Sequence, residues 1–257
     1  MERHFCLDDS PLFRMIELGD VDSTNNFLRH FAAPGDRRMM LVTAEFQTAG
    51  RGSDQNRWES ARGENLLLSL RVMPQQLPAN RMFAISEAAA LAVADALNVF
   101  APGFKVKWPN DVYHGDSKVC GMLIENDLQG RFVQRSTIGI GINVNQRTFL
   151  SDAPNPRSLA QITGHDVERR FVLEQFMEHF TRNMATINRG ELDALHASYL
   201  ENLYRKDEEH TYSDKDGTFR ATLIDVEPTG HLILQDTDGQ RRRYEFKEVK
   251  YVLGDQT

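Results

Sequence analysis

Features that mark secreted, membrane-spanning or metal-binding proteins are scarce in this chain of 257 residues. Its two cysteines, Cys6 and Cys120, are too few for a disulfide framework or a cysteine zinc site. The eight histidines are scattered, and none has the spacing of metal ligands. The start has no apolar signal-peptide core, and the most apolar window, residues 83–100, contains Glu87 and Asp95. We therefore expect a protein of the reducing cytoplasm with no membrane attachment.

An excess of positive charge is missing as well. The formal net charge is −7 and the sequence pI is about 5.6, which disfavours sequence-independent attraction to nucleic acid. About a dozen residues precede the first expected strand, too few for a helix-turn-helix domain. No DNA partner is expected.

Three familiar active-site motifs are absent. The glycine-rich stretch that begins at Gly50 has no Gly-Lys-Ser/Thr, so it is not a P-loop. Gly139-Ile140-Gly141 lacks the third glycine of a dinucleotide-binding fingerprint and lies within a run typical of a strand. Residues 115–119 lack the last glycine of a nucleophile elbow.

The stretch from Gly50 to Trp58 joins two apolar runs of strand length, 39–42 and 65–72. Connections this long usually have a function or are disordered. Gly50 and Gly52 let the backbone approach a ligand, Arg51 between them suits a carboxylate or phosphate, and Trp58 offers a flat face to a ring. A mobile surface loop whose tryptophan packs on the sheet fits these residue types equally well.

Hydrophobic periodicity predicts alternating strands and helices up to about residue 204. A helix should follow Ser23 or Asp22 as N-cap, and 104–113 should be one strand bent within by Trp108-Pro109-Asn110-Asp111. A hairpin turn is expected at 114–116. The other expected strands are 14–18, 118–125 and 132–145, and the other expected helices are 81–100, 173–187 and 192–199.

From about Arg205 the pattern changes. The alternating runs 219–226, 232–234 and 244–249 are separated by turn sequences, which indicates a small antiparallel barrel. Arg241-Arg242-Arg243 is expected at a solvated strand end. We predict one large domain, residues 1–204, and a small barrel domain, residues 205–257.

Polar and glycine residues cluster where strands end or turn. Gly139 and Gly141, two apart on one strand, would leave a side-chain-free floor on a sheet face. Lys118 and Gly121 are three apart and need a bend to share a site. Cations around an apolar floor suit an apolar acid that is activated by a nucleotide. Lys107 and Lys118 taken singly fit solvated edge lysines equally well.

Five motifs together resemble those of the biotin–protein ligases, in the same order and spacing. They are Ser23-Thr24-Asn25, Gly50-Arg51-Gly52 through Trp58, Lys107-Trp108-Pro109-Asn110-Asp111, Lys118 with Gly121, and Gly139 to Asn145. The resemblance covers residues 14–145 and extends to the C-terminal barrel. It implies an α/β (α+β) fold with a mixed sheet of the class II synthetase type and an SH3-like C-terminal barrel.

The resemblance implies a two-step, ATP-dependent reaction. Biotin is activated as biotinyl-5′-AMP and then transferred to a lysine of a biotin carboxyl carrier protein, within acetyl-CoA carboxylase or another biotin-dependent carboxylase or decarboxylase. Mg²⁺ would accompany ATP. Lys118 and Arg51 would stabilise charge on the reacting carboxylate and α-phosphate, and Asp111 would orient the incoming lysine.

The remaining site residues are carried over from the matching motifs. Gly139 and Gly141 would form the floor under the biotin rings, while Ser23, Thr24 and Gln47 would bind its ureido end. The residues implied for biotin are Ser23, Thr24, Asn25, Gln47, Gly50, Arg51, Gly52, Ser53, Lys118, Gly121, Gly139 and Gly141. The residues implied for ATP are Arg51, Arg57, Trp58, Lys107, Asn110 and Asn143.

One departure from the family pattern concerns the glycine-rich stretch. Members commonly have arginine or glutamine at the position of Ser53, whereas here Ser53-Asp54-Gln55 offers no cation before Arg57. We expect this stretch to be open without ligand and to close over biotinyl-AMP. We also expect it to release biotinyl-AMP faster than relatives whose loop contains a basic residue.

Two other functions stay open at this stage. Lipoate or octanoate ligases and transferases share the fold, although Gly50-Arg51-Gly52 with Trp58 and the Lys-Trp-Pro-Asn-Asp motif favour biotin. A biotin-binding regulator without catalysis is the second alternative. The oligomeric state, including a homodimer, is also left open.

Overall fold

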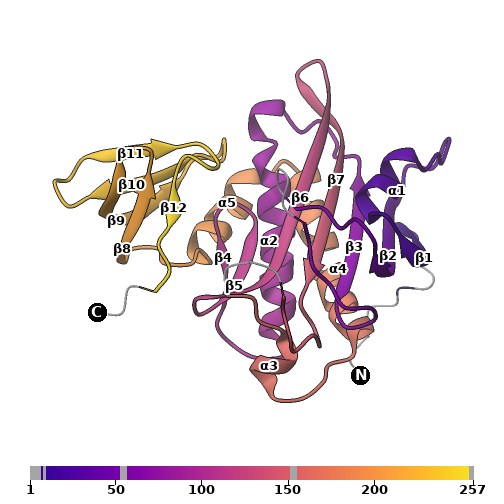
Figure 1. Cartoon of the computed structure of the whole chain (residues 1–257). Helices are drawn as coiled ribbons and strands as arrows, with labels where there is room; N and C mark the ends of the chain where they lie inside the picture. Colours follow the sequence, from indigo (N-terminus) through magenta and orange to yellow (C-terminus); the bar gives the residue numbers. More distant parts are fainter. Residues whose placement is uncertain (1–6, 8–9, 53–56, 151–154, 255–257) are drawn as a thin grey trace.

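The structure is a computed structural model that describes residues 7, 10–52, 57–150 and 155–254. A seven-stranded mixed sheet dominates it, in the order β1-β2-β3-β7-β6-β5-β4 (Figure 1). Strands β1 and β2 are parallel, and the other neighbours are antiparallel. The strands are β1 Phe13–Val21, β2 Met39–Gln47, β3 Leu66–Val72, β4 Phe104–Lys107, β5 Asp111–His114, β6 Ser117–Gln129 and β7 Phe132–Ile142.

Strand β3 explains why the two faces of this sheet differ. Side chains alternate along a strand, and here Leu66, Leu68 and Leu70 belong to the main core. Ser69 and Arg71 point to the opposite face, where both are buried and hydrogen-bonded. One face is therefore a hydrophobic interface, and the other is left for polar groups.

Helices α2 (Phe83–Asn98) and α4 (Arg169–Asn188) cover the apolar face. Nearly every position of α2 is buried, as expected of a core helix that packs on the sheet, on α4 and on α5 (Leu192–Glu201). The short elements are η1 Ala79–Arg81 and α3 Leu159–Thr163. No helix within the described residues is long and apolar enough to cross a membrane.

Helix α1 (Thr24–His30) lies on the polar face and packs Leu28 against Met40 and Val42 of β2. Arg71 fixes its C-terminal end by donating to the carbonyls of Leu28 and Phe31, at 3.2 and 2.8 Å. The last carbonyls of a helix have no donor within the helix, and here the Arg71 side chain supplies one. Strand β3 thus holds the helix that begins beside the site.

The expected N-cap of α1 is correct in position but not in bonding. Ser23 has the extended backbone of an N-cap, yet its side chain makes no capping hydrogen bond. Instead the Thr24 backbone N–H donates to Gln47 Oε1 at 2.8 Å. A side chain from the end of β2 replaces the local cap, so the helix start is tied directly to the neighbouring strand.

The expectation of one bent strand over 104–113 is wrong. Strands β4 and β5 are antiparallel, with Lys107 opposite Asp111, so Trp108-Pro109-Asn110 is a tight turn between them. The Trp108–Pro109 peptide bond is cis. This hairpin places Lys107 and Asp111 side by side at the edge of the polar face.

A second, five-stranded antiparallel sheet follows, in the order β11-β10-β9-β8-β12 (Figure 1). Its strands are β8 Glu209–Asp214, β9 Gly217–Val226, β10 Leu232–Asp236, β11 Arg241–Tyr244 and β12 Lys250–Tyr251. The strand expected over 244–249 is wrong, because β11 ends at Tyr244 and the arginines 241–243 form most of it. The predicted fold class is confirmed, and the boundary at residue 205 stays a prediction.

One buried ion pair between α2 and α5 gives stability a pH dependence. Glu87 Oε1 lies 2.6 Å from His196 Nδ1, and the two side chains are 3% and 13% exposed. The hydrogen bond to Glu87 raises the pKa of His196 above its ordinary value, against the opposing effect of burial. Because the folded pKa is raised, the pair stabilises fully below the unfolded pKa of about 6.5 and loses its contribution as pH rises through the folded pKa.

We therefore expect the free energy of unfolding to fall as pH increases from about 6.5 in the parent protein, and to fall less in His196→Gln. Denaturant unfolding at a series of pH values measures both slopes. Equal slopes in the two proteins would contradict a stabilising role for the protonated histidine.

Candidate functional site

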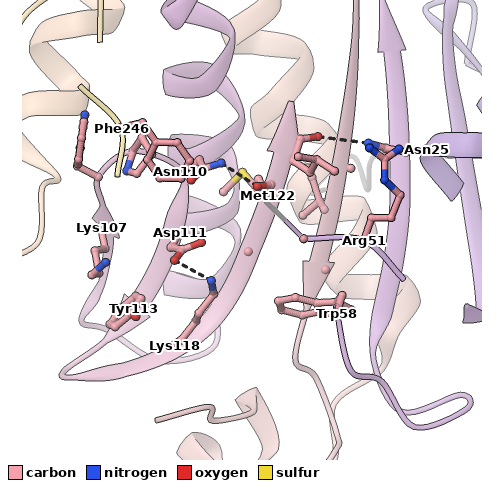
Figure 2. A pocket seen from close by; sticks show the side chains of 18 of the residues that line it. Asn25, Arg51, Trp58, Lys107, Asn110, Asp111, Tyr113, Lys118, Met122 and Phe246 are labelled. Carbon is pink, nitrogen blue, oxygen red and sulfur yellow. Dashed lines mark hydrogen bonds and ion pairs between the residues drawn. The ribbon is translucent and has the colours of Figure 1, made fainter. Parts of the chain in front are cut away.

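The polar face of the large sheet contains a cavity of about 410 Å³ (Figure 2). It is bounded by the start of α1, by the ends of the 50–58 stretch, by the β4–β5 turn and by the segment before and including β12. Predicted site residues that line it are Ser23, Thr24, Asn25, Gln47, Arg51, Gly52, Trp58, Lys107, Asn110, Asp111, Lys118, Gly121, Gly139 and Gly141. Three of the five sequence motifs thus line the cavity completely, the Gly50–Trp58 motif does so through Arg51, Gly52 and Trp58, and the fifth through residues 139–141.

Three predicted residues within the described chain do not line the cavity: Gly50, Arg57 and Asn143. Gly50 instead permits a close backbone approach, because a Cβ there would lie 2.7 Å from the Trp58 carbonyl oxygen. Asn143 Nδ2 donates to the Arg157 carbonyl at 3.3 Å. Ser53, Asp54 and Gln55 lie outside the described residues, so the expectations of loop closure and fast adenylate release stay predictions.

One end of the cavity is a set of linked hydrogen-bonding groups. Gln47 Oε1 accepts from both the backbone N–H and the hydroxyl of Thr24, at 2.8 and 3.0 Å. Ser69 Oγ lies 2.7 Å from Thr24 Oγ1 and 2.6 Å from Asn25 Oδ1. Ser23, Thr24 and Asn25 are all buried. Groups fixed in this way present a pre-organised polar surface to a ligand.

The glycines of β6 and β7 do not form one continuous floor. A Cβ on Gly139 would lie 2.5 Å from Asn25 Oδ1, so this glycine accommodates the asparagine. Gly141 and Gly121 are directly opposite each other in the register of β6 and β7. A side chain on either would overlap the ring of Trp58, which lies on this glycine pair. Side chains cover both predicted floor glycines in this structure, Asn25 over Gly139 and Trp58 over Gly141, and their role under the biotin rings stays a prediction.

Trp58 lines the cavity, and Figure 2 shows its ring below Arg51 and on the side of Lys118. Its indole N–H is buried and has no hydrogen-bond partner among the described residues. Buried donors are usually satisfied, so an unpaired one in a cavity favours a ligand acceptor at this point.

The bend that Lys118 and Gly121 require is present as a bulge in β6. The register with β5 shifts between Val112 and Tyr113, which face Cys120 and Lys118 respectively. As a result Lys118 Nζ lies 3.2 Å from the Cβ position of Gly121. Lys118 Nζ also donates to Asp111 Oδ2 at 2.7 Å, with the two side chains about one-fifth exposed.

The structure does not bring Arg51 to Lys118. Arg51 Nη2 lies 3.2 Å from Glu125 Oε1, and Arg51 Nη1 donates to Asn26 Oδ1 at 3.0 Å. Figure 2 shows Arg51 reaching toward Asn25 while Lys118 points to Asp111. The two predicted anion-binding cations are therefore each paired with a carboxylate.

Lys107 lies between two aromatic rings. Its Nζ is 5.2 Å from the ring centroid of Tyr113 and 4.4 Å from that of Tyr251, which belongs to β12. Burial lowers the pKa of Lys107, and the nearby Asp111 carboxylate opposes this shift. Cation–π contacts of this kind stabilise an ammonium group that has lost part of its water.

Sequence reasoning missed the contribution of the C-terminal sheet to the cavity. Residues of this segment that line it are Phe246, Lys247, Val249, Lys250, Tyr251 and Leu253. Trp108 connects the two parts by donating from Nε1 to the Gly230 carbonyl at 2.9 Å. Asn110 donates to the Met122 carbonyl at 2.7 Å and fixes the turn on β6. The turn was visible in the sequence, but its remote partners had no local signal.

Cys120 is a buried free cysteine. It lies fully within the main core on β6. Burial raises its pKa well above the ordinary value, so its thiol stays protonated and unreactive.

The large mixed sheet with its small C-terminal sheet matches the architecture of a solved biotin protein ligase. The sequence profile of the Biotin/lipoate A/B protein ligase family matches residues 19–143. This match supports the resemblance seen in the motifs, which lie within or just beyond the matched residues.

Relatives agree with this assignment. The biotin–[acetyl-CoA-carboxylase] ligase of Paracoccus denitrificans is 29% identical over 231 residues, which are 87% of this chain and 95% of that protein. The bifunctional ligase/repressor BirA of Bacillus subtilis is 30% identical over 214 residues, and the chain spans only 64% of its length. The solved biotin protein ligase from Aquifex aeolicus, in complex with biotin and ATP, superimposes with a TM-score of 0.75 at 25% identity and covers 93% of this chain and 99% of that one.

Proposed function

We propose that this chain is an ATP-dependent ligase that activates biotin as biotinyl-5′-AMP and transfers it to a lysine of a biotin carboxyl carrier protein. The relative from Paracoccus denitrificans is named a biotin–[acetyl-CoA-carboxylase] ligase, and the Aquifex aeolicus neighbour was solved in complex with biotin and ATP. The observation that carries the proposal is one cavity that holds a fixed polar group at Gln47 and Thr24, a flat indole ring at Trp58 and a cation, Lys118.

In the first step a carboxylate oxygen of biotin attacks the α-phosphorus of ATP. A new oxygen–phosphorus bond forms, and the bond to the β-phosphate breaks as pyrophosphate leaves with its electrons. Negative charge builds on the oxygens around phosphorus, so a preorganised ammonium group such as Lys118 lowers the barrier. Gln47, Thr24 and Ser23 hold the ureido end of biotin so that its carboxylate reaches this cation.

In the second step the amine of the carrier lysine attacks the carbonyl carbon of the mixed anhydride, and AMP leaves. The amine must lose a proton to become the final amide. Asp111 lies beside Lys118 and presents a carboxylate oxygen that can orient the incoming ammonium group and accept its proton.

The nucleotide is proposed to bind beside Trp58, Lys107 and Asn110, which line the cavity. Asp111 is the single carboxylate among the described lining residues, and it is already paired with Lys118. The described residues also contain no group of three or more potential metal ligands. Mg²⁺ is therefore proposed to bind through the oxygens of ATP, where it would neutralise phosphate charge.

The proposed partner is a biotin carboxyl carrier domain, of acetyl-CoA carboxylase or another biotin-dependent carboxylase or decarboxylase. We place the enzyme in the cytoplasm and propose neither DNA nor a membrane as partner. The repressor activity named for the Bacillus subtilis relative is not carried over, since the acidic charge of this chain opposes DNA binding. A homodimer stays open.

Biotin-dependent exchange of labelled pyrophosphate into ATP tests the proposal. The purified protein should catalyse exchange with biotin and should not do so with lipoate or octanoate, which decides against the ligases and transferases of the same fold. Exchange driven by octanoate alone would overturn the choice of substrate. Biotin binding without exchange would instead favour the non-catalytic regulator.

A further inference from the structure

Arg51 is held in its observed position by a built set of polar contacts. Glu125 Oε1 lies 3.2 Å from Arg51 Nη2, and Asn26 Oδ1 accepts from Arg51 Nη1 at 3.0 Å. The Asn26 amide is itself oriented, because its Nδ2 donates to Asp22 Oδ2 at 2.8 Å. The acceptors that face Arg51 are thus fixed by α1 and β6, not by chance side-chain positions.

The Glu125 carboxylate has partners that do not depend on Arg51. Its Oε2 accepts from Asn25 Nδ2 at 3.2 Å, and its Oε1 lies 3.2 Å from Arg29 Nη1. A buried or half-buried carboxylate that loses its only cation is costly. Glu125 avoids this cost, since Arg29 and Asn25 still compensate it when Arg51 leaves.

The reaction needs Arg51 elsewhere. Resting on the proposed function, the guanidinium should contact the biotin carboxylate and the α-phosphate, yet here it pairs with a protein carboxylate instead. One guanidinium cannot make its best two-pronged contact with two anions at once. Glu125 and the anionic oxygens of the substrates therefore compete for the same group.

We infer that Glu125 is a positioning residue that holds Arg51 beside Asn26 in the absence of substrate. When biotin and ATP bind, their anionic oxygens replace Glu125 as the partner of the Arg51 guanidinium. The pair is partly exposed, with 39% of the Arg51 side chain and 27% of the Glu125 side chain accessible. Ion pairs at such positions shift equilibria only modestly, by about two- to fivefold. The contact is strong enough to direct Arg51 and weak enough for a substrate to displace.

The substitution Glu125→Gln tests this competition. The amide keeps an oxygen for Asn25 Nδ2 but loses the charge that attracts Arg51. We expect the KM for ATP in biotin-dependent exchange to fall by about two- to fivefold at low salt, with kcat changed less than KM. At about 1 M salt, where the Debye length is about 3 Å, the difference from the parent should shrink.

A double-mutant cycle with Arg51 separates positioning from a general field effect. Removing the negative charge of Glu125 would also strengthen the binding of an anionic substrate by direct electrostatics, without any involvement of Arg51. If Glu125 acts through Arg51, however, Glu125→Gln should change the KM little in an Arg51→Gln background. An equal improvement in both backgrounds, or no improvement in either, would overturn the inference.

A measurement without substrates keeps this inference independent of the proposed function. Trypsin must bind the Arg51 side chain to cleave after it, so Glu125→Gln should speed cleavage between Arg51 and Gly52, detected by mass spectrometry. Cleavage after Arg62, which pairs with Asp20, is the matched internal control and should not change. Unchanged cleavage after Arg51 contradicts the contact, whereas absence of exchange in the parent contradicts only the proposed function.

Discussion

Replacing Lys118 by alanine is expected to slow biotin-dependent pyrophosphate exchange by about 10²–10³-fold, the typical loss when one preorganised donor to a charged transition state is removed. The physical reason is the position of Nζ, which the bulge in β6 holds over Gly121 and which Asp111 pairs at 2.7 Å. Single-turnover adenylation measured at saturating biotin and ATP checks the chemical step directly.

Two further variants make this result interpretable. Lys105→Ala removes a lysine on β4 that is exposed and lies near the Glu201 carbonyl, so its exchange rate should match the parent.

Lys118→Ala also leaves the Asp111 carboxylate without its lysine partner next to the incoming phosphates. Adding Asp111→Asn should therefore recover part of the lost ATP affinity but not the lost rate. Adenylation within tenfold of the parent in a folded Lys118→Ala protein would show that Lys118 does not serve the reacting groups.

Patterns that depend on near neighbours in the chain were readable from the sequence. Alternating side chains predicted the strands, and the need for a bend between Lys118 and Gly121 matches the bulge that the structure contains. The Ala-rich run predicted the buried helix α2. Such features follow from local geometry, which the order of residues fixes.

Partners that come from distant parts of the chain were not readable. Ser23 has the sequence of a capping residue, but Gln47 on a neighbouring strand supplies the acceptor. Residues 104–113 have the alternation of one strand, but the turn at Trp108 folds them into a hairpin. In both cases a tertiary contact overrides the local preference.

The glycine motif illustrates the same limit inside the site. Spacing alone assigned one role to Gly139 and Gly141, since both face the same side of β7. The structure separates them, because Asn25 of α1 covers the first and Trp58 covers the second. The partner of each glycine depends on how α1 and residue 58 are placed, and no pattern within β7 contains that information.

Substituting Gly139 by alanine should therefore destabilise the protein and weaken biotin binding together. The added Cβ would lie 2.5 Å from Oδ1 and 2.9 Å from Cγ of Asn25. Asn25 is buried and has little room to retreat, because Ser69 and the Leu123 carbonyl hold its side chain. Overpacking at such a position lowers the free energy of unfolding by about 1–3 kcal/mol. Denaturant unfolding measures the loss, and calorimetric titration with biotin measures the effect of displacing the start of α1.

Gly19→Ala is the matched control, because no heavy atom lies within 4 Å of the Cβ it would add on β1, and its effect should stay within about 0.5 kcal/mol. The double variant Gly139→Ala with Asn25→Ala tests the cause. If the overlap with Asn25 produces the loss, removing that side chain should make the pair of substitutions less destabilising than the sum of the two alone. If the two destabilisations are strictly additive, the alanine acts on the backbone of β7 itself. The interpretation that Gly139 makes room for the Asn25 side chain would then be wrong.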